Sequence, residues 1–316
     1  ETFGPSDSSE AGEGGMVWCK MRDNTLAYNH NLFDTNRGVQ KFLVSNTTAV
    51  YGTAAAGHSL TSFNSNGFTL GTNWNNENRS STTNASWTFR KAEKFFDVVT
   101  YTGDGTNTRR VSHNLNATPG FIVVKKTSAT QDWICSHSYD NNNNNFKLNT
   151  TGATFGAGYI DTPNETSFGV NDYGNPTDLN DSGATYVAYL FASDAGGFGE
   201  DGTENIIKCG SYTGNGNLVG PVVNTGFEPQ WVLLKSTATG IWSIFDNMRG
   251  IASGVSQDKV LQANATTSEY NEGAIGLTAT GFNIEATTHS NYNTNGQTYI
   301  YIAIRRPMKT PESGTE

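Results

Sequence analysis

One repeated stretch decides the fold of this chain. Residues 119–125 read PGFIVVK, and residues 229–235, which lie 110 positions further on, read PQWVLLK. Each stretch is a short apolar run that ends in lysine, as expected of a strand buried on both faces. Residues 16–20, MVWCK, take the same place near the start of the chain. The sequence therefore carries three copies of one strand-containing unit.

Other motifs repeat in the same order around this stretch. Three further pairs recur: YTGDG (101–105) and YTGNG (212–216), YVAYL (186–190) and YIYIA (299–303), FDTNRG (33–38) and FDNMRG (245–250). A period of about 110 residues is the size of one β-sandwich domain and is too long for a solenoid unit.

The composition favours strands and turns over helices. Charged residues make up only 16% of the chain, while 36 Asn, 41 Thr and 35 Gly are present. Thr suits a pleated surface, and Asn and Gly accept the backbone angles of tight turns. In the middle copy we predict strands over residues 95–101, 120–126, 132–138, 146–150, 167–171 and 184–192. We expect an all-β chain with no helix longer than a turn or two.

The repeats predict three tandem β-sandwich modules of about 110 residues each, of jelly-roll or immunoglobulin-like type. We place them at residues 1–94, 95–204 and 205–316, the last with a C-terminal linker. The first module is incomplete, because a Gly-, Ser- and Glu-rich stretch stands where its opening strand should be. We expect the modules to follow one another end to end, each with its own core, as part of a longer parent chain.

The net charge of −9 argues against nucleic acid as a partner, and no apolar run is long enough to insert into a membrane. Cys19, Cys135 and Cys209 are too few and too scattered for a disulfide framework or a zinc site. We predict that they are buried thiols.

The sequence contains few features typical of an enzyme. It has no P-loop, zinc-protease or serine-nucleophile motif, so we expect no catalytic residues, no cofactor and no metal. Asp34 and Asp246 each precede an arginine, Arg37 and Arg249, by three residues. We interpret them as ion-paired turn residues. The alternative is glycoside cleavage, which needs a second acid nearby in space.

A calcium site is a second alternative. Asp172, Asp178, Asn180 and Asp181 lie within ten residues of one another, and Asp104 sits in a glycine turn. Clustered oxygens are what calcium requires, but the spacing does not fit an EF-hand loop. We favour solvated turn residues, and a calcium site in one loop remains open.

Three aromatic residues lie in polar loops: Trp74 in TNWNN, Tyr173 in NDYGN and Tyr292 in SNYNTN. Amides can bond sugar hydroxyls, while aromatic rings can pack against the apolar faces of a sugar. We predict that these three residues contact a receptor or glycan. Taken singly, each ring is better interpreted as an anchor of its own loop, but three such loops at similar places in the three copies favour the contact role.

Residues 96–105 (FDVVTYTGDG), 111–115 (VSHNL) and 119–125 resemble a module of tail-fibre-like virion proteins of bacteriophages, especially marine ones. Residues 60–63 (LTSF) and 302–308 (IAIRRPM) resemble its other signatures. The resemblance implies a structural virion protein, a tail-fibre or spike segment that attaches to the host surface. It brings no catalytic residues.

The expected partners are other copies of the chain in a homotrimer, other virion proteins, and a host glycan or protein. Two alternatives are a head fibre or capsid decoration protein, and the polysaccharide depolymerase of a tailspike.

Overall fold

The computed structural model describes residues 13–23, 27–73, 77–141, 144–156, 158–175, 178–251, 258–286 and 289–305. These residues form 24 strands and one short 3₁₀ turn, Ser138–Asp140, with no α-helix among them. The prediction of an all-β chain is confirmed. No helix in this part of the chain is long and apolar enough to cross a membrane.

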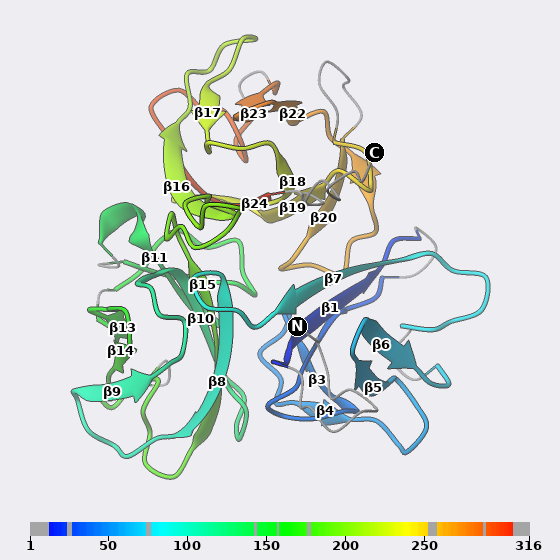
Figure 1. The fold of residues 1–316 in the computed structure, drawn as a ribbon, viewed down its shortest axis with the longest axis vertical. Helices are drawn as coiled ribbons and strands as arrows, with labels where there is room; N and C mark the ends of the chain where they lie inside the picture. The colour runs from blue at the N-terminus through cyan, green and yellow to red at the C-terminus, as the bar shows by residue number, and fades with distance from the viewer. Residues whose placement is uncertain are drawn as a thin grey trace, which may run out of the picture.

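Three main sheets, one from each repeat, form three lobes at the corners of a triangle (Figure 1). The first has the order β4 (Gly52–Thr53), β3 (Lys41–Val44), β2 (His30–Asp34), β1 (Gly15–Met21), β7 (Asn84–Arg90). The second has the order β12 (Asn145–Lys147), β11 (Ile134–His137), β10 (Pro119–Lys126), β15 (Thr185–Ala192), β8 (Phe96–Thr102). The third has the order β21 (Tyr270–Asn271), β20 (Lys259–Gln262), β19 (Trp242–Asp246), β18 (Pro229–Ser236), β24 (Thr298–Arg305), β16 (Ile207–Thr213).

The repeated stretch is a central strand in each main sheet, as β1, β10 and β18. Its register with the following strand is also repeated. Trp18 lies opposite Leu32, Val123 opposite Cys135 and Leu233 opposite Ile244. This register defines which residues of the three repeats are equivalent.

A smaller sheet covers the outer face of each main sheet (Figure 1). These sheets are β5 (Leu60–Asn64) and β6 (Gly67–Leu70); β13 (Ile160–Asp161), β14 (Ser167–Val170) and β9 (Arg109–Ser112); and β17 (Val222–Asn224), β23 (Gly281–Ile284) and β22 (Ile275–Thr278). Apolar residues fill the space between the layers, for example Phe282 and Val232 in the third repeat. The type of sandwich and the module boundaries remain predictions.

The expectation that each repeat has its own core is right in part, since the first and third repeats each have a separate cluster of buried apolar residues. The expectation of an end-to-end arrangement is wrong. The largest cluster of buried apolar residues contains Trp18 of the first repeat, Val123 of the second and Leu233 of the third. At its centre is an apolar void of about 20 Å³ that all three repeats line. The central strands are apolar on both faces, and the smaller sheets cover only the outer ones. The repeats therefore bury their inner faces against each other.

Polar contacts between the repeats run in one cyclic direction, from each repeat to the one before it. Trp133 Nε1 of the second repeat donates to Val44 O of the first at 3.0 Å, and Trp242 Nε1 of the third donates to Lys147 O of the second at 3.0 Å. Lys20 of the first repeat completes the circle, since its Nζ donates to Thr266 O of the third at 3.3 Å. The three repeats are thus related by an approximate three-fold rotation.

The first repeat differs in one strand. β8 pairs with β15 and β16 pairs with β24, but β7 has a strand on one edge alone among the described residues. The smaller sheet of the first repeat also has two strands where the other repeats have three. The outer edge of β7 is therefore left unpaired by the residues that the structure describes.

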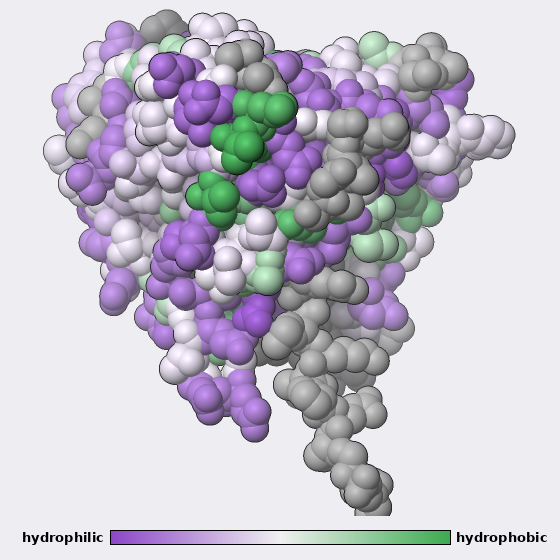
Figure 2. Space-filling view, turned by 90° about the horizontal axis from the view of Figure 1, so that it is seen from above, coloured by the Kyte–Doolittle hydropathy of each residue, from purple (hydrophilic) through white to green (hydrophobic). Residues whose placement is uncertain are grey.

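The face of the molecule seen in Figure 2 is largely hydrophilic. Figure 2 views the molecule from the side of the third repeat, where polar residues surround a small group of apolar ones. The exposed large apolar residues of this repeat are Leu218, Val219, Val222 and Met248. Met248 borders the groove described below.

Candidate functional site

Tyr292 is not a surface residue, and the prediction that it contacts a receptor is wrong. Its side chain is fully buried, with the hydroxyl 3.0 Å from Ser243 Oγ. Its main-chain oxygen accepts the Tyr212 hydroxyl at 2.8 Å, as Leu179 O accepts the Tyr101 hydroxyl in the second repeat. Tyr292 is therefore equivalent to the buried Leu179 rather than to Tyr173, and it anchors its own loop.

Tyr173 is exposed, with 51% of its surface accessible. Asp178 Oδ2 fixes its loop by accepting the main-chain N–H groups of Tyr173 at 2.8 Å and Asn175 at 2.5 Å. Burial raises the pKa of the Asp178 carboxyl, although these two bonds oppose that shift. The contact role of Tyr173 remains a prediction. Trp74 lies outside the described residues.

Tyr173 belongs to a row of three aromatic rings in the second repeat, here called the ring cluster: Phe155, Tyr159 and Tyr173. The ring centroids of Tyr173 and Tyr159 are 6.2 Å apart, and those of Tyr159 and Phe155 are 5.6 Å apart. The inner two rings are half-buried. The row thus presents one exposed ring on a packed aromatic base.

Buried polar groups lie next to the ring cluster, on the side of the protein interior. Asn145 is fully buried, and its Oδ1 accepts the main-chain N–H of Tyr159 at 3.2 Å. Its Nδ2 has no hydrogen-bond partner in the described part of the chain. Asn171 Nδ2 donates to Asp161 Oδ2 at 3.2 Å beside it. Since Asn145 and Asn171 are buried, these bonds fix the segments that carry the rings.

The acidic residues considered for calcium are engaged in turns. Asp104 Oδ1 accepts the side chains of Thr106 and Asn180 at 2.7 Å each, and Asp181 pairs with Lys126. Among the residues that the structure describes, no group of three or more His, Cys, Asp or Glu side chains is placed to hold a metal ion.

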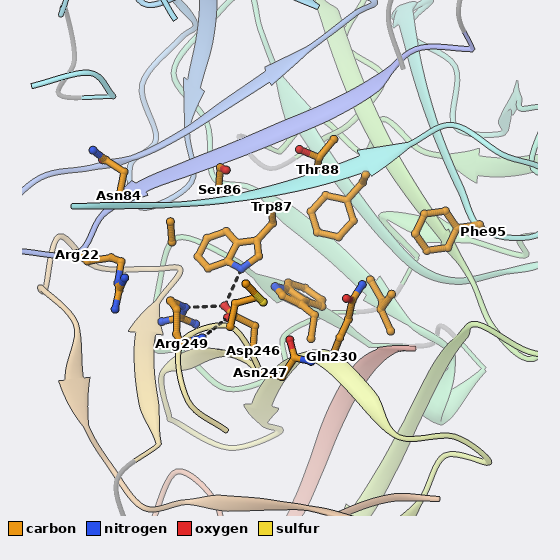
Figure 3. Close-up of a pocket in the computed structure, with 15 residues that line it drawn as sticks. Arg22, Asn84, Ser86, Trp87, Thr88, Phe95, Gln230, Asp246, Asn247 and Arg249 are labelled. Carbon is orange, nitrogen blue, oxygen red and sulfur yellow. Dashed lines mark hydrogen bonds and ion pairs between the residues drawn. The ribbon is translucent and has the colours of Figure 1, made fainter. Parts of the chain in front are cut away.

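A groove of about 480 Å³ lies between the first and third repeats (Figure 3). We call it the junction groove. It is lined by residues 84–89, 230–231 and 246–249, together with Arg22, Phe95 and Ile304. β7 forms one wall, and the strand ends of β18 and β19 form the other. None of these residues was predicted as a site.

Two tryptophans define the chemistry of the junction groove. Trp87 Nε1 donates to Asp246 Oδ2 at 2.8 Å, and the guanidinium carbon of Arg249 lies 5.3 Å from the centroid of the Trp87 ring. Trp231 is buried, and its Nε1 has no hydrogen-bond partner among the described residues. Met248 at the rim is 90% exposed. The groove therefore combines aromatic walls, one unsatisfied donor and an open mouth.

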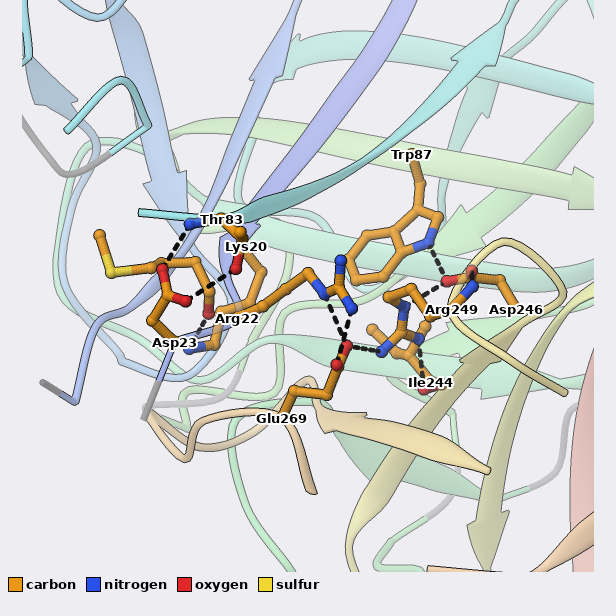
Figure 4. A network of polar contacts seen from close by, with 10 residues as sticks. Lys20, Arg22, Asp23, Thr83, Trp87, Ile244, Asp246, Arg249 and Glu269 are labelled. Carbon is orange, nitrogen blue, oxygen red and sulfur yellow. Dashed lines mark hydrogen bonds and ion pairs between the residues drawn. The ribbon is translucent and has the colours of Figure 1, made fainter. Parts of the chain in front are cut away.

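A network of ion pairs holds the third-repeat wall of the groove (Figure 4). Arg249 Nε lies 2.5 Å from Asp246 Oδ2, and Arg249 Nη1 lies 3.2 Å from Glu269. Arg22 of the first repeat forms a two-bonded pair with the same Glu269, at 2.8 Å for each bond. Burial opposes ionisation of Glu269, but the arginine bonds outweigh it and hold the pKa of this carboxyl below its usual value.

The first repeat has the same acidic turn. Arg37 Nε lies 2.5 Å from Asp34 Oδ2, which also accepts the Tyr189 hydroxyl of the second repeat at 2.8 Å. The interpretation of Asp34 and Asp246 as ion-paired turn residues is confirmed. Their partners Tyr189 and Trp87 belong to the next repeat around the axis, which sequence spacing does not reveal.

In the second repeat the equivalent position is His137, since it lies opposite Phe121 as Asp34 lies opposite Met16. Its Nδ1 accepts the main-chain N–H of Tyr139 at 3.1 Å, so its Nε2 donates to Tyr301 O at 3.1 Å. The second repeat lacks the Asp–Arg turn of the other two repeats, and His137 in its place also bridges to the following repeat.

No curated protein matches this chain. A solved structure titled "Crystal Structure of the STIV MCP" shares 9% identity, over 66% of this chain and 95% of that one. Its TM-score of 0.20 is too low to support an argument about fold or function. A family described as a domain of unknown function (DUF7483) matches residues 8–307. Since that match spans most of the sequence, the chain belongs to this family.

Proposed function

We propose that this protein is a non-enzymatic structural protein of a virion, a tail-fibre or spike segment that attaches the particle to a glycan on the host surface. The observation that carries the proposal is the ring cluster, in which Tyr173 is half exposed above two further rings. The resemblance of the repeat motifs to tail-fibre-like virion proteins supports the setting.

The surroundings of Tyr173 suit a neutral sugar. An exposed ring can pack against the apolar face of a pyranose, and its hydroxyl can bond at the ring edge. Asp172 and Asn175 flank Tyr173 in the same accessible loop and offer acceptors and donors to sugar hydroxyls. Since Asp178 fixes the loop backbone, little ordering is required on binding.

A single exposed ring makes a weak site. Attachment therefore depends on several copies acting together on one particle, as a homotrimer or an array of fibres provides. Other virion proteins then serve to hold these copies in place.

The acids at the junction groove favour attachment over a depolymerase activity. Glycoside cleavage needs one carboxyl with a raised pKa as the acid and a second as base or nucleophile. Asp246 is bonded to Arg249 and Trp87, and Glu269 is bonded to two arginines that lower its pKa. The carboxylate that lines the groove, Asp246, and the nearby Glu269 are thus both held in structural ion pairs.

Binding of purified protein to a glycan array, together with competition against particle adsorption, tests the proposal. Replacing Tyr173→Ala should weaken glycan binding about tenfold, which corresponds to about 1.4 kcal/mol. Tyr51→Ala is the matched control, since Tyr51 is an exposed tyrosine of the first repeat, 38% accessible and outside the cluster. An unchanged glycan affinity in a folded Tyr173→Ala protein would remove the ring cluster from the site. Wild-type protein that neither binds glycan nor blocks adsorption would overturn the function.

A further inference from the structure

Two of the three junctions between repeats are filled by an opening strand. At the junction of the first and second repeats, β8 places Phe96 and Val98 in the shared core, where the Phe96 ring lies 5.8 Å from that of Phe89. At the junction of the second and third repeats, β16 places Ile207 and Cys209 in the same way. Each strand therefore supplies two apolar side chains, spaced two residues apart.

The junction groove occupies the corresponding place at the third junction. Phe89 of β7 is equivalent to Phe191 and Ile304, which lie opposite Phe96 and Ile207. No strand lies opposite Phe89 on that side among the described residues. The cavity is thus the space that an opening strand fills in the other two repeats.

Met248, at the mouth of the groove, also lacks the contact that the equivalent residue of the first repeat makes. In the first repeat, Asn36 Nδ2 donates to the main-chain oxygen of Val98 in β8 at 2.9 Å. The equivalent residue of the third repeat is Met248, in FDNMRG, and it is 90% exposed at the mouth of the groove.

β7 has the side-chain pattern of a strand ready to pair. Ala85, Trp87 and Phe89 are buried, while the residues between them are exposed and polar. Alternate N–H and C=O groups of a strand point to each edge, so the outer edge of β7 presents a row of main-chain donors and acceptors. An open edge of this kind is the template for strand addition.

Trp231 adds an independent observation. It is 96% buried in the opposite wall of the groove, and its Nε1 donor has no partner in the described part of the chain. Leaving a buried donor without a hydrogen bond costs free energy, and an acceptor bound in the groove would remove that cost. A strand main chain carries acceptors along its whole length.

We infer that the junction groove is an acceptor site for one extended β-strand, a donor strand from outside residues 1–316. The donor strand pairs antiparallel with the outer edge of β7 and inserts two apolar side chains, at positions i and i+2, between Trp87 and Trp231. Residues 1–12 of this chain, ETFGPSDSSEAG, contain one large apolar residue, Phe3, and so lack the required pair. This inference does not rest on glycan binding, and it assigns the groove to assembly.

The strand of the second repeat supplies the probe. A capped synthetic peptide of residues 94–104, KFFDVVTYTGD, carries the side chains that fill the equivalent junction. Titrated into the full chain, it should bind saturably with a stoichiometry of one and change the tryptophan fluorescence. A peptide with the residues matching Phe96 and Val98 replaced by serine should bind at least tenfold more weakly. A peptide with proline at the position of Val99 should also lose affinity, because it cannot complete the main-chain ladder.

The variant Trp231→Phe tests the wall of the groove. Measured on folded variant protein, it should weaken peptide binding several-fold, because it removes the Nε1 donor for which the strand supplies an acceptor. Equal binding of the serine peptide, or no saturable binding of the wild-type peptide, would overturn the inference. Binding that occurs only in a full-length Phe3→Ser variant would also overturn it, since the chain's own first residues would then be the occupant. None of these outcomes depends on Tyr173.

Discussion

The hydroxyl of Tyr189 in the second repeat donates to Asp34 Oδ2 of the first repeat at 2.8 Å. The same carboxylate pairs with Arg37, so one buried acid joins a turn of its own repeat to a strand of the next. Trp87 and Asp246 make the matching bond between the first and third repeats. These bonds hold the orientation of the repeats around the shared core.

Removing either partner of the Asp34–Tyr189 bond should destabilise the whole chain. We expect Asp34→Asn to cost about 3–5 kcal/mol, because it leaves a buried guanidinium without its charge partner. Tyr189→Phe should cost about 1–2 kcal/mol, as the loss of one buried hydrogen bond to a charged group. Urea unfolding of both single variants and the double variant measures the coupling between them. Additive effects would show that the two residues do not interact.

Acid should weaken the junction between the second and third repeats. Burial lowers the pKa of His137 to about 4, although its bond to Tyr301 O opposes this shift. An unfolded histidine takes up its proton near pH 6.5, so the unfolded chain binds more protons between pH 6.5 and 4. The free energy of unfolding should therefore fall as the pH is lowered through this window.

The comparison of His137→Asn with His289→Asn isolates this effect, since His289 lies at the surface. Unfolding of His137→Asn should depend less on pH between 6.5 and 4 than that of the parent protein. A pH dependence that is unchanged in His137→Asn would contradict the assignment.

Mildly alkaline pH should raise the free energy of unfolding, through three buried lysines. Burial lowers the pKa of Lys20, Lys125 and Lys235 to about 8. Unfolded lysines hold their protons up to about pH 10.4, so the unfolded chain binds more protons above pH 8. Stability should rise from pH 8 toward pH 10 and then fall, because burial raises the pKa of tyrosines such as Tyr189 and their ionisation then favours unfolding.

The variant Lys125→Met should show a smaller rise in the unfolding free energy from pH 8 to 10. Lys208→Met, at a surface ion pair, is the control and should keep the full rise. Chemical denaturation at a series of pH values provides the measurement. Stability that declines steadily from pH 8 would refute the prediction.

The thiols should be inert until the chain unfolds. Cys19, Cys135 and Cys209 are free and buried, as the sequence predicted, and burial raises the pKa of each one. Since the thiolate is the reactive form, a thiol reagent should label none of them in the native protein and all three in denaturant. Rapid labelling of native protein at one position would indicate local opening there.

The central strands could be predicted because their signal is local. Runs such as PGFIVVK are apolar enough to require burial on both faces, and the spacing of the motifs shows the repeat. The same run cannot show what covers its second face, since a neighbouring repeat and a second sheet demand the same residues. The shared core was missed for this reason.

The prediction for Tyr292 failed for a different reason. Tyr292 has polar neighbours in sequence, but its ring is buried beside Ser243, which lies 49 residues away. Polar neighbours in the sequence indicate a loop, but they do not show whether a side chain in that loop points to the core or to solvent. The junction groove left one sequence signal, the absence of a YTGxG strand in the first copy, but its walls come from three separate segments.

The shared core makes the trio of repeats, rather than the single repeat, the piece that recombination can transfer intact between proteins. A gene lacking one copy would expose the inner faces of the remaining two, and a gene with a fourth copy would have no face to receive it. We therefore expect natural variants of this chain to differ in their outer loops and to keep the number three.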